Sequence, residues 1–337
     1  MRVVAISCVK NEGDIIEAFV RHIAAFVDQL VVLDNGSTDE TAWILCSLKN
    51  EGIPMEIVED PSPGHWQWKR MTYLMKDYAI KRYGADWIIP LDADELIVAQ
   101  DPITFRAALE SYAQPLKIKW KTYIPDSSDD INESNPVLRI CHRLVEEGKV
   151  CKKIMVPGNI PRLHDNVIIA HGNHKLFVNG KKCKCLDLDS VHLAHIPIRS
   201  PEQYVSKIAI GHLQHMALLE KKKNWGWHWE LAYELIKTDI DSFTGTFREA
   251  ALRYAVRPER NFSPETVLDP IPYLGESLKY TKVSHDRWEI FLSVINYAES
   301  LAKSYANLAL EHGKTLEKVE KLEKLTRKFR FLTRFMT

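Results

Sequence analysis

The sequence contains no long apolar run, no excess of charge of one sign and no regular cysteine pattern. No apolar run approaches the roughly 20 residues of a membrane-spanning helix, so we do not expect an integral membrane protein. Met1 and Arg2 lead directly into a short apolar run at 3–6, so we expect no secretion signal and a cytoplasmic location. Lys plus Arg and Asp plus Glu each number 45, which argues against a protein that coats nucleic acid.

The six cysteines lack the spacing of a disulfide framework. Cys183 and Cys185 are separated by one residue, which is closer than the usual zinc-binding pair. A zinc site that also uses Cys141 or Cys151 is an alternative to six reduced thiols. The sequence also lacks internal repeats and low-complexity tracts.

The first hundred residues alternate between strand-like and helix-like segments. Short apolar, β-branched runs predict strands, and apolar residues at helical spacing predict the helices between them. The predicted strands are 3–8, 30–33, 55–58 and 87–91, and the predicted helices are 14–26, 39–48 and 68–83. This order predicts an α/β fold of the Rossmann-like kind, with a mostly parallel mixed sheet and helices on both faces.

The later segments predict two further regions. Short strands at 116–120, 167–170 and 175–178 are expected to complete the sheet, between loops that face a substrate. Ser200 and Pro201 suit a helix cap and first turn, and helical patterns follow. We therefore expect a catalytic domain over 1–200 and a helical region over 201–337.

Three polar clusters follow predicted strands, and ligands of open α/β sheets bind at such strand ends. The clusters are Lys10-Asn11-Glu12, residues 34–39 and residues 92–95. Asp92 and Asp94, two residues apart on an extended chain, would point to the same side, where Mg²⁺ or Mn²⁺ would offset their repulsion. A solvated loop or a helix cap is the alternative.

The segment 34–39 has both a structural and a functional interpretation. Asn35-Gly36 predicts a turn, and Asp39 is a helix-cap candidate. Asp34 is the candidate for contact with a base or ribose.

These three motifs together resemble family 2 glycosyltransferases of the GT-A fold, in particular a bacterial subgroup whose metal motif reads Asp-x-Asp-Glu. The resemblance covers residues 2–96 and continues more weakly through 192–207. It implies a nucleotide-sugar donor, most often a uridine diphosphate (UDP) sugar. It also implies that Asp34 lies near the nucleobase and that Asp92 and Asp94 serve ribose, metal and diphosphate.

The resemblance also implies further donor contacts. Gln67 matches a position that faces the nucleotide, with Lys69 and Arg70 as nearby candidates for phosphate or as solvated helix residues. Lys10, Asn11 and Glu12 are candidates for donor contact, and capping of the first helix is the alternative for Asn11 and Glu12.

A histidine late in the domain is expected as a further metal or phosphate ligand. The segment 192–200 resembles that region, with Glu202, Tyr204 and Lys207 after it. His195 is the first candidate and His192 the second, and their spacing of three places them on opposite faces of a strand. His171 and His174 form a competing cluster.

The catalytic base is expected in the polar loop after the strand that ends near residue 123. An inverting transfer needs a carboxylate to accept the proton of the acceptor hydroxyl. The usual acidic motif of the family is absent here, and the candidates are Asp126, Asp129, Asp130 and Glu133.

The segment 314–337 has one apolar stripe at helical spacing and eight Lys or Arg residues against three Glu. It carries +5, so residues 1–313 sum to −5. A basic amphipathic helix suits an anionic membrane surface, and packing in a domain or homodimer is the alternative. Attachment to the inner face of the cytoplasmic membrane would fit a lipid-linked acceptor.

The predicted activity is therefore metal-dependent, inverting transfer of a hexose-like sugar. The acceptor would be a glycan, a lipid-linked precursor or lipopolysaccharide, as in lipopolysaccharide or capsule synthesis. A nucleotidyltransferase is one alternative, although residues 8–13 lack its Gly-rich phosphate loop. A non-catalytic nucleotide-binding or scaffold protein is the other.

Overall fold

The computed structural model describes residues 1–62, 64, 66–216, 227–254, 256, 262–282 and 287–333. The chain divides into two compact units, Met1–Ser293 and Val294–Thr337. The domain boundary predicted at residue 200 falls inside the first unit.

The amino-terminal half of the main sheet is parallel, in the order β3-β2-β1-β4. Each predicted strand and helix of this half is confirmed, with shifts of one or two residues at most ends. The strands are β1 (Val3–Val9), β2 (Gln29–Asp34), β3 (Met55–Glu59) and β4 (Trp87–Leu91). The helices are α1 (Ile16–Ala24), α2 (Thr41–Asn50) and α3 (Gln67–Tyr73), which continues as the π-helix η1 (Leu74–Arg82).

Helices cover both faces of this sheet, as its unbroken apolar strands predict. One face packs on α1, α2 and α4 (Pro102–Glu110), in a core that includes Val3 and Ala5 of β1. The other face packs on α3 and η1, in a core that includes Val4 and Ile6. The alternation along β1 thus places a buried core on each side and confirms the predicted α/β class.

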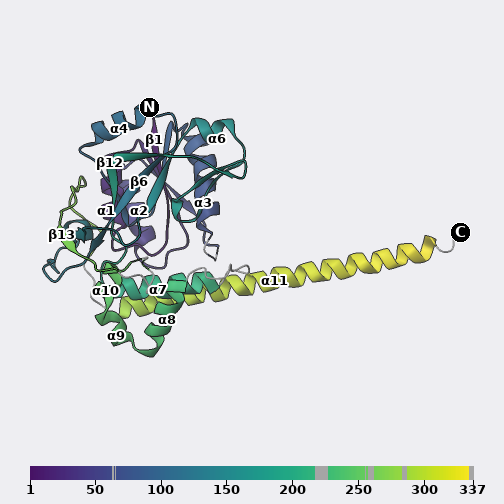
Figure 1. Ribbon diagram of the computed structural model, residues 1–337. Helices are drawn as coiled ribbons and strands as arrows, with labels where there is room; N and C mark the ends of the chain where they lie inside the picture. Colours follow the sequence, from purple (N-terminus) through teal and green to yellow (C-terminus); the bar gives the residue numbers. More distant parts are fainter. Residues whose placement is uncertain are drawn as a thin grey trace. The chain divides into compact units, whose positions relative to one another are not determined.

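The second half of the sheet is mixed and differs in part from the prediction. It contains β5 (Glu95–Val98), β6 (Leu116–Ile124), β7 (His142–Leu144), β8 (Lys152–Pro157), β12 (Leu186–His195) and β13 (Thr266–Leu268). β12 pairs in parallel with β6, and the two lie side by side in Figure 1. The expectation that 167–170 and 175–178 join this sheet is wrong. They form β9 (Val167–Ile169) and β10 (Leu176–Val178). Strand β10 pairs with both β9 and β11 (Lys181–Lys182), and the three make a separate small sheet that packs against α3.

Pro90 marks where β4 separates from its antiparallel neighbour β8. The two strands pair only at Trp87 and Ile88, so the missing N–H of Pro90 breaks no bond on that side. Because β8 runs in the opposite direction, its second residue, Lys153, lies near the end of β4. This arrangement brings a lysine to the acidic residues that follow β4.

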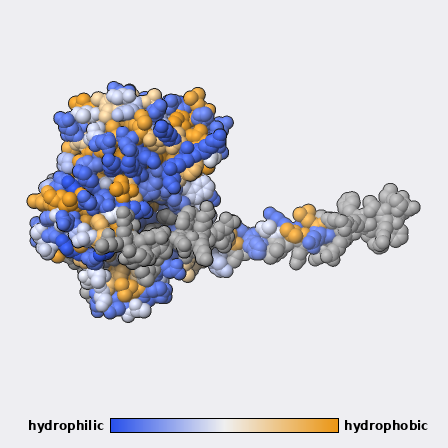
Figure 2. All heavy atoms as spheres, in the orientation of Figure 1, coloured by the Kyte–Doolittle hydropathy of each residue, from blue (hydrophilic) through white to orange (hydrophobic). Residues whose placement is uncertain are grey.

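Helices α7 to α10 form a cluster in the first unit (Figure 1). They are α7 (Pro201–Met216), α8 (Trp227–Thr238), α9 (Ile240–Gly245) and α10 (Phe247–Leu252). The short elements α5 (Pro136–Arg139), α6 (Asn159–Leu163) and η2 (His171–Asn173) lie in loops between strands. Hydrophilic residues cover most of the visible face of this unit, with apolar residues in separate patches (Figure 2).

Helix α11 runs from Arg287 to Thr333. It begins in the first unit, and its residues from Val294 onward belong to the second. The predicted helix over 314–337 is confirmed as far as Thr333, and the side chains from residue 324 onward lie outside the described residues. Among the helices that the structure describes, none combines the length and apolar character needed to cross a bilayer.

Candidate active site

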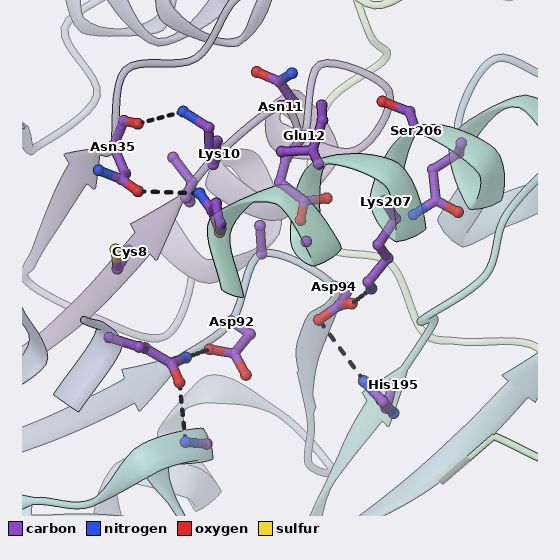
Figure 3. A pocket seen from close by; sticks show the side chains of 18 of the residues that line it. Cys8, Lys10, Asn11, Glu12, Asn35, Asp92, Asp94, His195, Ser206 and Lys207 are labelled. Carbon is purple, nitrogen blue, oxygen red and sulfur yellow. Dashed lines mark hydrogen bonds and ion pairs between the residues drawn. The ribbon is translucent and has the colours of Figure 1, made fainter. Parts of the chain in front are cut away.

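A cavity of about 300 Å³ lies where the parallel strands end. We call it the first cavity, and Figure 3 shows it from close by. Its walls come from the loops after β1, β2 and β4, from the start of α3, from β8 and β12, and from α7. The three sequence clusters therefore meet at one edge of the sheet, as their positions after strands predict.

The loops after β1 and β2 are joined by Lys10. Its ammonium donates to the carbonyl oxygens of Asn35 and Gly36 at 2.7 and 2.8 Å. Gly36 has a φ of +67°, and a Cβ there would lie 3.2 Å from Pro61, so the turn requires glycine. Burial lowers the pKa of Lys10 to about 8, despite the charge of nearby Asp34. Lys10 therefore lines the cavity as a cation that loses its proton more easily than an ordinary lysine.

Asp34 closes its own loop rather than lining the cavity. Its Oδ1 accepts hydrogen bonds from the backbone N–H and the hydroxyl of Ser37 at 3.0 and 2.5 Å. The next residue, Asn35, lines the cavity, and its amide oxygen accepts from Gln214 at 3.3 Å. The nucleobase contact of Asp34 stays a prediction. Of the two side chains, only Asn35 lines the cavity.

The residues predicted on α3 separate into two groups. Gln67 and Arg70 line the cavity, whereas Lys69 is exposed and its ammonium lies 3.9 Å from the Trp66 ring centre. Arg70 is buried, and its guanidinium donates to residues of the preceding loop. It donates to Asp60 at 2.7 Å and to the carbonyl oxygens of Ser62 and Gly64. Its clearest function is therefore to hold Asp60, Ser62 and Gly64 in place.

Asp92 is surrounded by donors from three elements. Its Oδ1 accepts from Gln67 at 2.8 Å and from Asn173 at 3.1 Å, and its Oδ2 pairs with Lys153 at 2.6 Å. Lys153 is buried and also contacts Glu95 at 2.7 Å. Burial acts to lower the pKa of Lys153, but the carboxylates of Asp92 and Glu95 outweigh it and raise that pKa.

The extended conformation predicted for residues 92–94 is wrong. These residues form a turn between β4 and β5, in which Glu95 N–H donates to the Asp92 carbonyl at 3.1 Å. The Glu95 carboxylate in turn accepts from Asp92 N–H at 3.1 Å. Because the chain turns here, Asp92 and Asp94 have separate partners rather than one shared side.

Asp94 lies between α7 and β12 (Figure 3). Its Oδ2 pairs with Lys207 of α7 at 2.7 Å, and its Oδ1 lies 3.8 Å from Nε2 of His195. Burial acts to raise the pKa of the Asp94 carboxyl, but the Lys207 ammonium outweighs it and the pKa lies below its ordinary value. Asp94 is therefore a buried anion at neutral pH.

His195 is a buried, neutral imidazole that faces this anion. Its ring stacks on Trp120 at 4.3 Å between centroids, and burial lowers its pKa to about 3. Its Nδ1 has no hydrogen-bond partner among the described residues. His192, three residues earlier, does not line the cavity. Of the competing pair, His174 lines the cavity and binds the Lys152 carbonyl, whereas His171 does not line it.

A divalent cation fits this site only in part. Among the described residues, His, Cys, Asp and Glu side chains form no group of three or more that could hold a metal, which also leaves the zinc alternative without support. Asp94 Oδ1 and His195 Nε2 fit as two ligands of Mg²⁺ or Mn²⁺, because both are buried and face each other. Both oxygens of Asp92, the other predicted ligand, are already bonded. The remaining ligands would have to come from phosphate oxygens and water.

Glu12 adds a third carboxylate to the cavity wall. It pairs with the buried guanidinium of Arg199 at 2.7 Å, and the same guanidinium binds Asp14 at 2.6 Å. Neither Glu12 nor Asn11 caps α1 with its side chain. Asn11 instead exchanges hydrogen bonds with Thr38, its amide oxygen accepting at 2.8 Å and its amide nitrogen donating at 3.1 Å.

The base candidates Asp126, Asp129, Asp130 and Glu133 do not line the cavity, and their role as base stays a prediction. Asp126 pairs with Arg248 at 2.7 Å, and Asp129 accepts from the Asp126 N–H at 2.8 Å. Asp130 and Glu133 accept from N–H groups of their own loop. The Asp- and Ser-rich composition of this loop therefore reflects turn formation.

Several cavity residues were not predicted from the sequence, namely Lys153, Trp120, Tyr254 and Gln214. Asn173, which donates to Asp92, was not predicted either. Lys153 had the clearest sequence signal, because a lysine precedes the apolar run 154–156 directly. A charged residue at the start of a buried strand needs a partner of opposite charge, and the acidic cluster 92–95 offers one.

Comparisons with known proteins reveal distant similarities only. No protein family model matches the chain. Uncharacterised proteins of Mycobacterium tuberculosis and Mycobacterium bovis are each 30% identical over 114 residues. That match covers 32% of this chain, and the chain spans about a quarter (26%) of the length of these relatives.

Similar solved structures include residues 1–349 of Staphylococcus aureus TarS in complex with UDP (TM-score 0.41, 12% identity, 73% of this chain and 74% of that chain). They also include a Pyrobaculum calidifontis mannosyltransferase in complex with GDP-Man and Mn²⁺ (TM-score 0.37, 16% identity, 74% of each chain). A third is glucosyl-3-phosphoglycerate synthase of Mycobacterium tuberculosis (TM-score 0.26, 21% identity, 35% of this chain and 44% of that chain). Because these identities and TM-scores are low, the likeness carries no conclusion about function.

Proposed function

We propose that this protein is a glycosyltransferase that moves a sugar from a nucleoside diphosphate sugar to an acceptor hydroxyl. The observation that carries the proposal is the mixture of charges in the first cavity. Lys10, Lys153 and Lys207 lie among the carboxylates of Glu12, Asp92 and Asp94. Cations suit a diphosphate, and a buried carboxylate suits proton removal from a hydroxyl. The motifs that resemble family 2 glycosyltransferases supply Lys10, Glu12, Asp92 and Asp94 of this set.

The donor diphosphate would lie against Lys207, with Asp94 and His195 as the protein ligands of Mn²⁺ or Mg²⁺. When bound, the ion would neutralise charge on the leaving diphosphate. Lys207 pairs with Asp94 at 2.7 Å, so its ammonium would lie close to the charge of a diphosphate bound next to Asp94. Lys10 and Asn35 would line the nucleoside end, for which we propose uridine.

Glu12 is the proposed catalytic base in place of the loop aspartates. Asp92 and Asp94 pair with lysines and Glu12 pairs with Arg199. Burial nevertheless raises the pKa of Glu12 to about 7, against the opposing charges of Arg199 and Lys207. The acceptor oxygen would bond to the anomeric carbon while the bond from that carbon to the diphosphate breaks. The electron pair leaves with the diphosphate, and the acceptor proton passes to Glu12. This single displacement inverts the anomeric centre.

The proposed base predicts a specific pH profile. A base must be ionised, so kcat/KM of the wild type should fall as pH drops below about 7. Besides Arg199 and Lys207, the charges of Asp94 and Asp14 act on Glu12, and both favour its protonation. In Glu12→Gln, kcat/KM at pH 8 should fall by about 100-fold or more and the acidic limb should disappear. An unchanged limb in a folded Glu12→Gln protein would remove Glu12 from this role.

The reaction itself is best tested by donor screening. Purified full-length protein with Mn²⁺ is incubated with a panel of UDP, GDP and ADP sugars, and release of the nucleoside diphosphate is measured. We expect release from one class of donor, and a rise in melting temperature with UDP plus Mn²⁺ above that with UDP alone. Pyrophosphate release from a nucleoside triphosphate would favour a nucleotidyltransferase. A nucleotide-induced shift without any turnover would favour a binding protein.

The acceptor class includes a lipid-linked precursor or lipopolysaccharide, and the support for it is the basic segment 314–337. Deleting this segment should reduce co-sedimentation with liposomes that contain anionic lipid, without changing donor hydrolysis. Equal binding of the full-length and shortened proteins would contradict attachment to the membrane. Dimerisation through the same segment would appear as a change in molar mass by light scattering.

A further inference from the structure

A second cavity, of about 510 Å³, shares part of its wall with the first. Asn11, Gln203 and Ser206 line both cavities. The second cavity lies between the loop after β1, the start of α2, the start of α7 and the segment 280–282. The proposed reaction needs a place for the acceptor next to the donor, and this cavity is adjacent.

The two cavities differ in charge. The second is lined by the carboxylates of Asp14, Asp39, Glu40 and Glu202, and Lys282 is the one Lys or Arg among its described lining residues. In the first cavity, by contrast, the carboxylates of Glu12, Asp92 and Asp94 are balanced by the cations Lys10, Arg70, Lys153 and Lys207. Phosphate groups would therefore be repelled from the second cavity, whereas hydroxyl groups would find acceptors for their hydrogen bonds.

The second cavity also has an aromatic wall. Trp43 is 52% exposed although it is a large apolar side chain, and its ring contacts Tyr280 edge-on at 5.5 Å between centroids. An exposed indole face carries negative charge density and attracts polarised C–H groups. The ring face of a sugar supplies such C–H groups, and its hydroxyls would reach the surrounding carboxylates. Together they fit a polyhydroxylated ring.

This wall is held rigid by a buried carboxylate and contains one unpaired polar atom. Glu17 accepts hydrogen bonds from the backbone N–H groups of Tyr280 and Thr281 at 2.8 and 2.7 Å. Thr281, which lines the cavity, is only 8% exposed, and its hydroxyl has no hydrogen-bond partner among the described residues. A buried hydroxyl without a partner carries a free-energy cost that a ligand hydroxyl would remove.

We infer that the second cavity is the acceptor subsite and binds an uncharged sugar ring of a glycan, without phosphate. This inference rests on the proposed function, since it assigns the other substrate of the same reaction. Arg199 links the two cavities, because it binds Glu12 in the first and Asp14 in the second. A ring on Trp43 would direct a hydroxyl across the shared wall toward the first cavity and Glu12.

Saturation-transfer NMR of the full-length protein tests the subsite with methyl glycosides of glucose, galactose, mannose and N-acetylglucosamine. At least one glycoside should bind, and Trp43→Ala should weaken its binding about fivefold or more. Glu202→Gln, which removes a lining charge, is a second variant in case Trp43→Ala does not fold. Tyr305→Ala, an aromatic residue that is 75% exposed in α11, is the matched control and should bind normally.

Binding of UDP, measured on the same samples, separates the two proposals. We expect UDP affinity to stay within about twofold in Trp43→Ala, because that residue does not line the first cavity. If no glycoside binds the wild type, or if neither variant weakens binding, the subsite is overturned whatever UDP does. A wild type that binds a glycoside at Trp43 but neither binds nor hydrolyses any nucleotide sugar would overturn the proposed function instead.

Discussion

Asp94→Asn is expected to lower kcat for sugar transfer by about 100- to 1000-fold while the protein stays folded. Asparagine keeps the shape of the side chain but removes the negative charge that faces Lys207 at 2.7 Å and His195 at 3.8 Å. Without that charge, Lys207 loses its fixed position and the pair of proposed metal ligands is lost. The measurement is steady-state nucleoside diphosphate release at saturating donor and Mn²⁺, with near-UV circular dichroism to confirm the fold.

The matched control for this variant is Asp126→Asn. The chemical change is identical, but Asp126 lies outside the first cavity and pairs with Arg248. We expect its kcat to stay within about twofold of the wild type. If Asp94→Asn retained most of its turnover, the site would be wrongly assigned. If Asp126→Asn lost turnover at an unchanged melting temperature, the loop after β6 would regain its role as source of the base.

Glu17→Ala is expected to lower the free energy of unfolding of the first unit by about 3 to 5 kcal/mol. The Glu17 carboxylate is 0% exposed and accepts the backbone N–H groups of Lys279, Tyr280 and Thr281 at 2.7 to 2.8 Å. It also accepts from Arg21 at 3.0 Å. Removing it leaves three backbone N–H donors, of which that of Thr281 is buried, and one cation without this partner. Urea unfolding, followed by circular dichroism, measures the loss.

The stability that Glu17 provides should also depend on pH. Burial acts to raise the pKa of Glu17, but the three N–H groups and Arg21 outweigh it and lower that pKa. Its contribution is therefore complete above its unfolded pKa of about 4.3 and is lost as pH falls toward the lower folded value. The stability difference between wild type and Glu17→Ala should shrink below about pH 4. Glu110→Ala, at an exposed glutamate, should change stability by less than about 0.5 kcal/mol at any pH.

The parallel half of the fold was predictable because its signals are local. Strands such as 87–91 are short apolar runs, and the polar residues after them must lie at one edge of a parallel sheet. The positions of Lys10, Glu12, Asp92 and Asp94 at the cavity follow from this rule.

The remaining features depend on contacts between distant segments. Lys153 reaches Asp92 only because β8 runs antiparallel beside β4, a pairing that the sequence does not reveal. For the loop containing Asp126, the sequence does not distinguish turn residues from catalytic acids, because both are rich in aspartate. The turn at 92–94 was missed because it depends on the Glu95 side chain binding back to Asp92.

The contact of Glu17 with residues 279–281 also has a consequence for biosynthesis. Helix α1 leaves the ribosome well before the partners of its buried carboxylate, which are 262 to 264 residues further along. The amino-terminal sheet would therefore form early with an open flank and close only when translation of the first unit is nearly complete. A nascent chain stalled before residue 279 should expose α1 to proteases and chaperones, and one released after residue 293 should not.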